Sequence, residues 1–278
     1  MATDSGRAAE RDRGFLEQLN DRTFRRLGVV GTTAFALGVA LFIGYILTVR
    51  VDYALLINIV YPQFTFAFLR VIGIVLVSSV LSVIAGVMVG LARVSQTRVT
   101  SSIAKSYIEF FRGTPLLFQL FVIYLGVPQL WPPGQFPIQG FNYYAAVIGL
   151  TLNHAAYVGE ALRGGIESIP DGQMEASRSL GMSYIQSMRE VILPQAWRNS
   201  LAAIGNDQVI LVKDTSLLTV LAIPELLSAF RQINSATFDA WTPIVLVAIA
   251  YLMITVPLGK VIRTLEARAD PATHGGDD

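Results

Sequence analysis

Long apolar stretches separated by short polar ones make up most of this chain. Roughly 20 apolar residues in a helix are needed to cross the hydrocarbon core of a bilayer. Three stretches reach that length without any Asp, Glu, Lys or Arg, namely Leu27–Val49, Val71–Ala92 and Ala240–Gly259. The pattern predicts an all-α integral membrane protein.

The rest of the apolar sequence predicts three further spans. No charged residue occurs between Gly113 and Glu160, but Pro and Gly cluster from Pro128 to Gly140, which predicts two spans joined by an extended loop. The segment Trp197–Leu221 is the least hydrophobic. The six predicted helices lie near residues 27–49, 66–92, 106–130, 141–163, 196–222 and 241–263. No repeat of 20–50 residues is visible, which argues against a solenoid.

The composition agrees with a membrane protein and excludes several kinds of chemistry. Hydrophobic residues make up 53% of the chain and charged residues only 15%. Cysteine is absent, which excludes disulfides, iron–sulfur clusters and thiol catalysis. With His154 and His274 as the two histidines, a metal site would need mostly carboxylate ligands. Metalloenzyme and redox functions are therefore disfavoured.

The positions of the basic residues predict the orientation in the membrane. If the N-terminus is cytosolic, most of the 21 Lys and Arg residues fall in cytosolic segments, as the positive-inside rule requires. Residues 1–26 are then a charged cytosolic tail, too charged and too long before the first apolar run for a cleaved signal peptide. Residues 265–278 form a second cytosolic tail.

One polar stretch, Gly172–Pro194, has strong helix signals outside the predicted spans. Asp171 or Gly172 can start a short helix and Gly181 can end it, while Ser183 and Gln186 match a capping box for a second helix that Pro194 follows. Glu175 can pair with Arg178 at i,i+3. On these signals alone the stretch is either a compact cytosolic knob or an amphipathic loop on the membrane surface.

The same stretch resembles the signature of ABC importer transmembrane subunits. Those proteins carry Glu-Ala-Ala, then Gly six residues after the Glu, then an aliphatic residue, any residue and Leu-Pro. This sequence has Ser177 and Val191 in place of the second Ala and the usual Ile. In that family the loop is the coupling helix that docks on a cytosolic ATPase. The resemblance therefore assigns coupling to Glu175, Ala176, Ser177, Gly181, Leu193 and Pro194.

Three further segments are similar to the polar amino acid permeases of that family, the group that serves histidine, glutamine and arginine. They are Phe110–Leu116 (FFRGTPL), Tyr157–Gly165 (YVGEALRGG) and Lys213–Leu217 (KDTSL). The resemblance implies a five-helix importer core at residues 64–264 with a coupling loop at 166–194. Residues 27–49 would be an added N-terminal helix that the resemblance does not explain.

Charged residues at membrane depth are candidates for function, because each costs about 2.5–3.5 kcal/mol on insertion scales. Asp207 and Asp214 lie two turns apart on one helix face. They could face the ammonium groups of an amino acid, or they could form an internal ion pair or packing cluster with Lys213 or another helix. The residues alone leave both interpretations open.

The resemblance favours the substrate path. It places the Lys213–Leu217 segment on the helix that lines this path, and an acid after Asn206 tilts the expected substrate towards a basic amino acid. The residues expected along the path are Asp207, Lys213, Asp214, Thr215, Ser216, Arg112 and Thr114.

Other polar residues are interpreted as structural. Glu160 and Arg163, at i,i+3, are expected to support the loop, and Glu109 and Arg112 have the same spacing. His154 is interpreted as a hydrogen-bonded packing residue. Small residues are expected to let helices approach closely at Ser78, Ser79, Ser82, Gly86 and Gly90.

Active transport needs an energy source that this chain lacks. No G-x-x-x-x-G-K-[ST] phosphate loop is present, so we expect no ATPase site and no bound cofactor here, with ATP and Mg²⁺ on a cytosolic ABC ATPase dimer. A second permease subunit, identical or related, and an extracytoplasmic solute-binding protein would complete a polar amino acid importer that works by alternating access. We expect no nucleic acid partner. The resemblance implies a multi-pass protein of the prokaryotic inner membrane with both termini in the cytosol.

Two rival functions remain at this stage. A self-powered secondary transporter is expected to show inverted repeats and helices broken at the midplane, and neither is visible in the sequence. A channel or purely structural membrane protein would leave the polar knob without a role.

Overall fold

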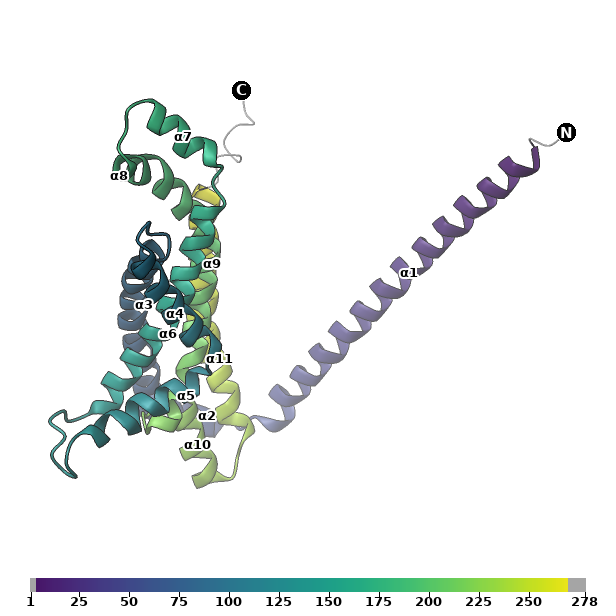
Figure 1. Ribbon diagram of the computed structural model, residues 1–278. Coiled ribbons are helices and arrows are strands. Elements are labelled where there is room, and N and C mark those ends of the chain that lie inside the picture. Colours follow the sequence, from purple (N-terminus) through teal and green to yellow (C-terminus); the bar gives the residue numbers. More distant parts are fainter. Residues whose placement is uncertain (1–3, 270–278) are drawn as a thin grey trace. The chain divides into compact units, whose positions relative to one another are not determined.

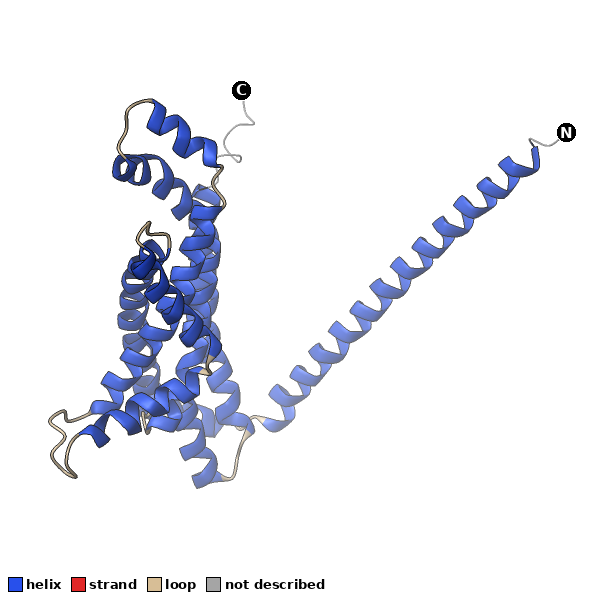
Figure 2. Cartoon of the chain, in the orientation of Figure 1, coloured by secondary structure: helices blue, strands red, loops and turns tan. Residues whose placement is uncertain are grey.

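The computed structural model describes residues 4–269, with side chains from residue 24 onward. Within that range the chain is helical almost throughout and contains no strand (Figure 2). The prediction of an all-α protein is confirmed. Of the two expected tails, residues 1–3 and 270–278 lie outside the described residues.

The chain divides into two units, Met1–Tyr53 and Ala54–Asp278. In the first unit, α1 (Asp4–Tyr45) is one uninterrupted helix that passes into a π-helical turn, η1 (Ile46–Arg50). The expected boundary between the tail at 1–26 and the span at 27–49 is therefore not marked by any break in the helix. The part Phe24–Arg50 is long and apolar enough to cross a membrane.

The second unit holds the remaining helices. In chain order its first half contains α2 (Tyr53–Ile59), η2 (Val60–Phe64), α3 (Thr65–Arg93), α4 (Arg98–Gly113), α5 (Leu116–Phe121), η3 (Val122–Gly126), η4 (Val127–Leu130) and α6 (Phe141–Glu167). Its second half contains α7 (Asp171–Ser179), α8 (Tyr184–Ser187), η5 (Met188–Ile192), α9 (Leu193–Asp214), η6 (Thr215–Leu221), α10 (Leu226–Thr237) and α11 (Trp241–Ala269).

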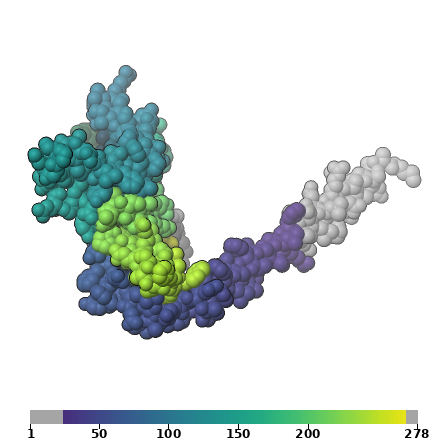
Figure 3. Space-filling model, turned by 90° about the horizontal axis from the view of Figure 1, so that it is seen from below, coloured from purple at the N-terminus to yellow at the C-terminus, as the bar shows by residue number. Residues whose placement is uncertain are grey.

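Helix α6 lies at the centre of the second unit, where it packs against α3, α4 and α9, while α11 packs against α9 and α10. Helices α7 and α8 lie at one end of this bundle, and α10 lies at the other (Figure 1). Figure 3 views the α10 end, where the lime-green residues of α10 and early α11 lie over the bundle.

The α3–α6 contact depends on glycine. An added Cβ at Gly86 would lie 2.5 Å from the Cβ of Val158, and one at Gly90 would lie 2.9 Å from the carbonyl oxygen of Gly159. Ser78 and Ser82 are fully buried on the same helix. The expectation that small residues permit close packing is confirmed at these positions.

The predicted single helix at 106–130 is wrong. Its first part belongs to α4, which begins at Arg98, and the chain bends by 103° between α4 and the helical segment Leu116–Leu130. Thr114 is extended at the bend, with φ −117° and ψ 146°. The cause is Pro115, which cannot donate a backbone hydrogen bond and forces the residue before it out of the helical region.

The count of six spans stays a prediction. In the described chain, three helices are long and apolar enough to cross a membrane, or four if the bent pair counts as one span. Helices α6 and α9 do not meet that test. The helices α2 and α10 were not predicted.

Candidate functional site

The polar stretch between α6 and α9 folds into a knob of two short helical segments, α7 and α8–η5, at one end of the bundle (Figure 1). Helix α7 begins at Asp171, as predicted. Gly181 takes a φ of +86°, a left-handed conformation that glycine adopts without strain, and its amide donates to the carbonyl of Arg178. The turn after α7 is thus the one that the sequence predicts.

The second helical segment begins with the predicted capping box. The amide of Ser183 donates to Oε1 of Gln186 at 2.8 Å, and the amide of Gln186 donates to Oγ of Ser183 at 3.3 Å. The segment does not stop before Pro194 as expected. It runs through the π-turn η5 directly into α9, and Pro194 occupies the first turn of that helix, where its missing N–H is tolerated.

The knob presents one set of residues outward and anchors another. Glu175 and Ala176 are exposed, whereas Ser177 is buried and donates its hydroxyl to the carbonyl of Met174. Leu180 and Ile185 are 82% and 76% exposed, and they lie in the knob, outside the predicted spans. The anchoring side chains pack on the ends of α3 and α6, and they include Met174, Met188, Val191 and Ile192.

The expected ion pair between Glu175 and Arg178 is absent from the described part of the chain. Arg178 donates instead to the carbonyl of Met182 at 2.9 Å, across the Gly181 turn. The carboxylate of Glu175 is thereby left exposed at the surface of the knob.

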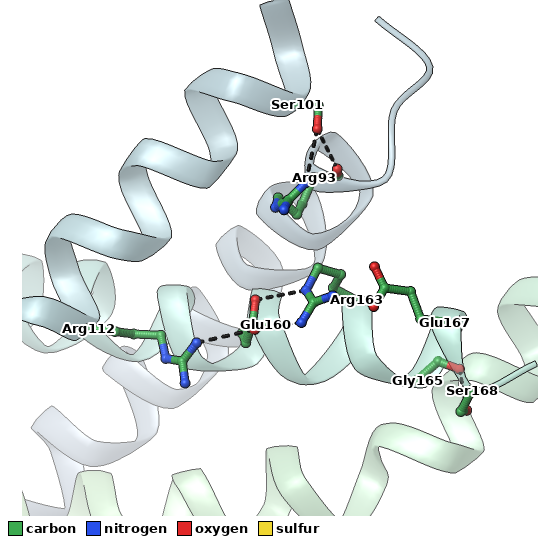
Figure 4. A network of polar contacts seen from close by, with 8 residues as sticks. All are labelled: Arg93, Ser101, Arg112, Glu160, Arg163, Gly165, Glu167 and Ser168. Carbon is green, nitrogen blue, oxygen red and sulfur yellow. Dashed lines mark hydrogen bonds and ion pairs between the residues drawn. The ribbon is translucent and has the colours of Figure 1, made fainter. Parts of the chain in front are cut away.

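A row of charged side chains lies where the knob joins α6 (Figure 4). Glu160 accepts from Arg163 at 2.8 and 3.0 Å and pairs with Arg112 of α4 at 3.3 Å. Arg163 also pairs with Glu167, one turn further along α6. Glu160 and Arg163 therefore contact each other as predicted, and with Arg112 they join α4 to the C-terminal half of α6.

Two residues expected along the substrate path, Arg112 and Thr114, lie at the α4–α5 bend. Arg112 does not pair with Glu109, which contacts Lys105 instead, because the guanidinium extends over the ring of Tyr157 towards Glu160. The hydroxyl of Thr114 donates to the carbonyl of Phe110 at 2.8 Å. Both residues contact protein groups that stabilise the bend.

The face of α9 that meets α6 carries an acid–histidine cluster. Nδ1 of His154 lies 3.0 Å from Oδ1 of Asp207, and its Nε2 lies 3.4 Å from Oδ2 of Asp214. The two carboxylates share a helix face, as their spacing predicts. Their common partner is a histidine that the sequence analysis treated as a packing residue.

The neighbouring face of α9 lines an open groove against α11. Asn206 and Lys213 lie in this groove with Thr255 and Arg263 of α11. Thr215, at the point where α9 tightens into the 3₁₀ helix η6, is fully buried and donates to the carbonyl of Val212, while Ser216 is half-buried. The expected path residues of α9 therefore point in two directions, Asp207 and Asp214 towards α6 and Lys213 towards α11.

Two buried amides were not anticipated at all. Nε2 of Gln119 donates to the carbonyls of Phe111 and Thr114, and Nδ2 of Asn153 donates to Oε1 of Gln119 at 3.0 Å. These bonds hold the α4–α5 bend against α6. The available signal was an amide in each of two apolar runs, which marks a buried polar group in need of partners.

Comparison with protein families gives the assignment. The model for the family described as "Binding-protein-dependent transport system inner membrane component" matches residues 82–274. The chain belongs to this family. The matched residues include the knob, the acid–histidine cluster and the groove along α11.

Relatives of known name support the same assignment over most of the chain. The "Arginine transport system permease protein ArtQ" of Bacillus subtilis is 35% identical over 195 residues, which are 70% of this chain and 87% of ArtQ. The "Glutamine transport system permease protein GlnP" of Escherichia coli is 37% identical over 183 residues, 66% of this chain and 82% of GlnP.

Solved structures agree in fold. One described as "Crystal structure of an amino acid ABC transporter with histidines" is 32% identical, with a TM-score of 0.71, and the match covers 79% of this chain and 99% of that one. The MetNI methionine ABC transporter, in inward-facing conformations, has a TM-score of 0.58 at 19% identity and supports the fold alone. The chain is an ABC importer permease subunit, a class whose ATPase is a separate protein.

Proposed function

We propose that this permease imports polar amino acids across the inner membrane of a prokaryote, driven by ATP hydrolysis on a partner. The observation that carries the proposal is the knob at α7 and α8, which presents Glu175, Ala176 and two exposed apolar side chains at one end of the bundle. Relatives that share the family core are named for arginine and glutamine transport. A surface of this kind fits a groove on an ATPase, because exposed apolar residues rimmed by polar ones mark protein interfaces.

The expected protein partners would supply what this chain does not provide for transport. Its sequence has no phosphate loop, so ATP and Mg²⁺ belong on a cytosolic ATPase dimer. A second permease, a copy or a relative, would complete the translocation path, and an extracytoplasmic binding protein would deliver the substrate. The orientation with knob and termini in the cytosol is supported by the distribution of Lys and Arg.

The mechanism is alternating access. When the two ATPases close on ATP, they draw the docking knobs of the two permeases together. Each knob continues into α6 and α9 without a flexible linker, because Ser168–Pro170 and η5 are short. The helices therefore rotate with the knobs, and the path opens outward. ATP hydrolysis lets the ATPases separate and returns the path inward.

The substrate path would run along the groove face of α9 and the end of the α6 face. Lys213 and Asp214 offer opposite charges to the carboxylate and ammonium of an amino acid. Thr215 and Ser216 follow them in η6, and Arg112 and Thr114 lie at the α4–α5 bend. Asp207 is the basis for the tilt towards a basic amino acid.

Co-reconstitution tests the function directly. The permease is placed in proteoliposomes with its ATPase and binding protein, and ATP hydrolysis is measured with and without each amino acid. Amino-acid-stimulated ATPase activity together with ATP-dependent uptake is the expected result. Uptake by the permease alone would overturn the proposal, because it would indicate a self-powered transporter or a channel.

A charge reversal on the knob tests the docking assignment. Glu175→Lys should reduce ATP-dependent uptake by more than tenfold and leave the melting temperature in detergent unchanged, because Glu175 is exposed and the expected pair with Arg178 is not formed. Gln173→Lys, on the opposite side of α7, is the matched control and should retain uptake. Normal uptake by the Glu175 variant would show that docking uses another surface.

A further inference from the structure

His154 is the most deeply buried titratable residue of α6, and both of its ring nitrogens face a carboxylate. The side chain is 1% exposed, with Asp207 at 3.0 Å from Nδ1 and Asp214 at 3.4 Å from Nε2. Ionised carboxylates only accept hydrogen bonds, and a neutral imidazole has one N–H. If both carboxylates are ionised, each ring nitrogen faces its carboxylate favourably only with a hydrogen on it, and the ring is then a cation between two anions.

The two carboxylates are not equivalent. Asp207 has a side chain only 9% exposed, makes the shorter contact with the ring, and also accepts from Gln208 Nε2 at 3.3 Å. Asp214 is 30% exposed, and the nitrogen that faces it has no partner within normal hydrogen-bond geometry. Asp207 is thus committed to His154, whereas Asp214 is loosely held and open on one side.

The location of Asp214 makes its placement important. It is the last residue of α9, at the point where the helix tightens into η6, and it follows Lys213, which lies in the groove along α11. Asp214 therefore lies at the junction of α9 and η6, between the face of α9 that meets α6 and the face that lines the groove. If Asp214 is held less firmly, the positions of the side chains at this junction change.

We propose that His154 is a positioning residue of the substrate path. Asp207 orients the His154 ring, and the ring in turn positions the Asp214 carboxylate and balances its charge. The part of this inference that concerns the substrate rests on the proposed function. It assigns Asp207 to the support of His154 and leaves Asp214 as the acid of the cluster that can meet an ammonium group. The substrate group recognised by Asp214 is a cationic group near the junction, which every amino acid supplies as its ammonium.

The experiment compares variants in the reconstituted complex with ATPase and binding protein. The readout is the ratio of amino-acid-stimulated to basal ATPase activity, per amount of assembled complex. A purely structural role of His154 would lower the amount of complex and leave this ratio unchanged. Ser200→Ala, a buried position of α9 whose hydroxyl bonds only within its own helix, is the matched control.

His154→Gln alone leaves Asp207 as a buried unpaired charge and can prevent folding. The double variant His154→Gln/Asp207→Asn removes that charge and keeps an amide pair in its place. We expect it to assemble but to lose about tenfold in the stimulated ratio, because the Asp214 carboxylate then has no positive charge beside it. We also expect Asp214→Asn to cause a similar loss, and the triple variant to lose no more than Asp214→Asn alone, because the residues act as one unit.

A normal ratio in the double variant would overturn the proposal, since His154 would then only neutralise Asp207. The proposal would also be overturned if the loss in the triple variant equalled the product of the losses in the double variant and in Asp214→Asn.

A second readout does not depend on transport. The natural sequence has no cysteine, so a single Ser216→Cys reports on the junction, and maleimide should label it severalfold faster in the double variant. If the wild-type complex shows no amino acid stimulation, the proposed function fails, and unchanged labelling would separately overturn the role of His154.

Discussion

The knob and the acid–histidine cluster are both polar, but they are held in opposite ways. In the knob the hydrogen bonds join residues three to five positions apart, as between Ser183 and Gln186 or Ser177 and Met182. In the cluster the bonded residues are far apart in sequence, as His154 and Asp207 are. The knob can therefore form as a local unit, whereas the cluster exists only after α6 and α9 have packed. Changes in the knob should affect docking, and changes between the helices should affect the whole bundle.

The strongest test of this difference is at Gly165, where α6 meets α9. A Cβ at this position would lie 2.5 Å from the backbone oxygen of Ala196, so Gly165→Val forces the two helices apart. We expect a loss of more than about 3 kcal/mol in stability and little recoverable protein. Gly164→Val is the matched control, because no atom lies within 4 Å of a Cβ there. Recovery is measured by size-exclusion chromatography of detergent extracts, and equal recovery of both variants would contradict the packing.

A smaller effect is expected from the amides at the α4–α5 bend. Gln119→Leu leaves the carbonyls of Phe111 and Thr114 buried without their donor, and it should cost about 2–3 kcal/mol. Gln195→Leu removes a single bond from α9 to the carbonyl of Val191, four residues earlier in η5, and should cost less than about 1 kcal/mol. Thermal unfolding in detergent measures both. Gln119→Leu also removes the acceptor of Asn153 on α6. Equal costs in the two variants would show that this bond between helices adds nothing to the local ones.

The Gly181 turn tests the local side of the comparison. Gly181→Val places a β-branched residue at a φ of +86° and should cost about 1–2 kcal/mol, confined to the knob. Gly181→Asn, a residue that tolerates this conformation, should stay close to wild type. Limited trypsin digestion at the exposed Arg178 should be faster in the Val variant alone. A lower melting temperature of the whole bundle would argue against local folding of the knob.

The smallest effect concerns Asp239, which caps the start of α11. Burial raises the pKa of this carboxyl, but hydrogen bonds from Thr242 and from the amide of Trp241 lower it further, so the net pKa lies below the ordinary value. Its contribution to stability is present above the ordinary carboxyl pKa and is lost as pH falls through the lowered one, below about pH 4. Asp239→Asn should change little at pH 7, because Asn also caps well. Melting temperatures between pH 3 and 7 check this, and an unchanged acid-side slope in the variant would contradict it.

The sequence predicts the locally bonded features of the knob better than the contacts between helices. The start of α7, the Gly181 turn and the Ser183–Gln186 capping box are correct, because each depends on residues within one turn of each other. The break at Pro115 was also encoded locally, but the strong apolar run around it led to a single predicted helix. A proline after an extended residue outweighs hydrophobicity in deciding where a helix ends.

The partners of the buried polar groups could not be predicted. The spacing of Asp207 and Asp214 predicts a shared face, yet nothing in the sequence indicates that His154 lies opposite them. Arg112 shows the same limit, since Glu109 has the right spacing for a pair but Glu160, on another helix, takes that place. Helix packing decides these contacts, and a single sequence does not contain the register of one helix against another.

The glycine contact between α3 and α6 has a mechanical consequence. With Gly86, Gly90 and Gly159 at the crossing, the two backbones approach closely, and the side chains of Val89, Val158 and Leu162 pack directly against these glycines. Helix α6 has 27 residues, and at 1.5 Å per residue it is about 40 Å long. Together with α3 it forms a stiff beam that carries the knob at one end. A displacement of the knob then rotates the far ends of α3 and α6 by a similar angle. The chain can bend at Thr114 and where α9 tightens into η6.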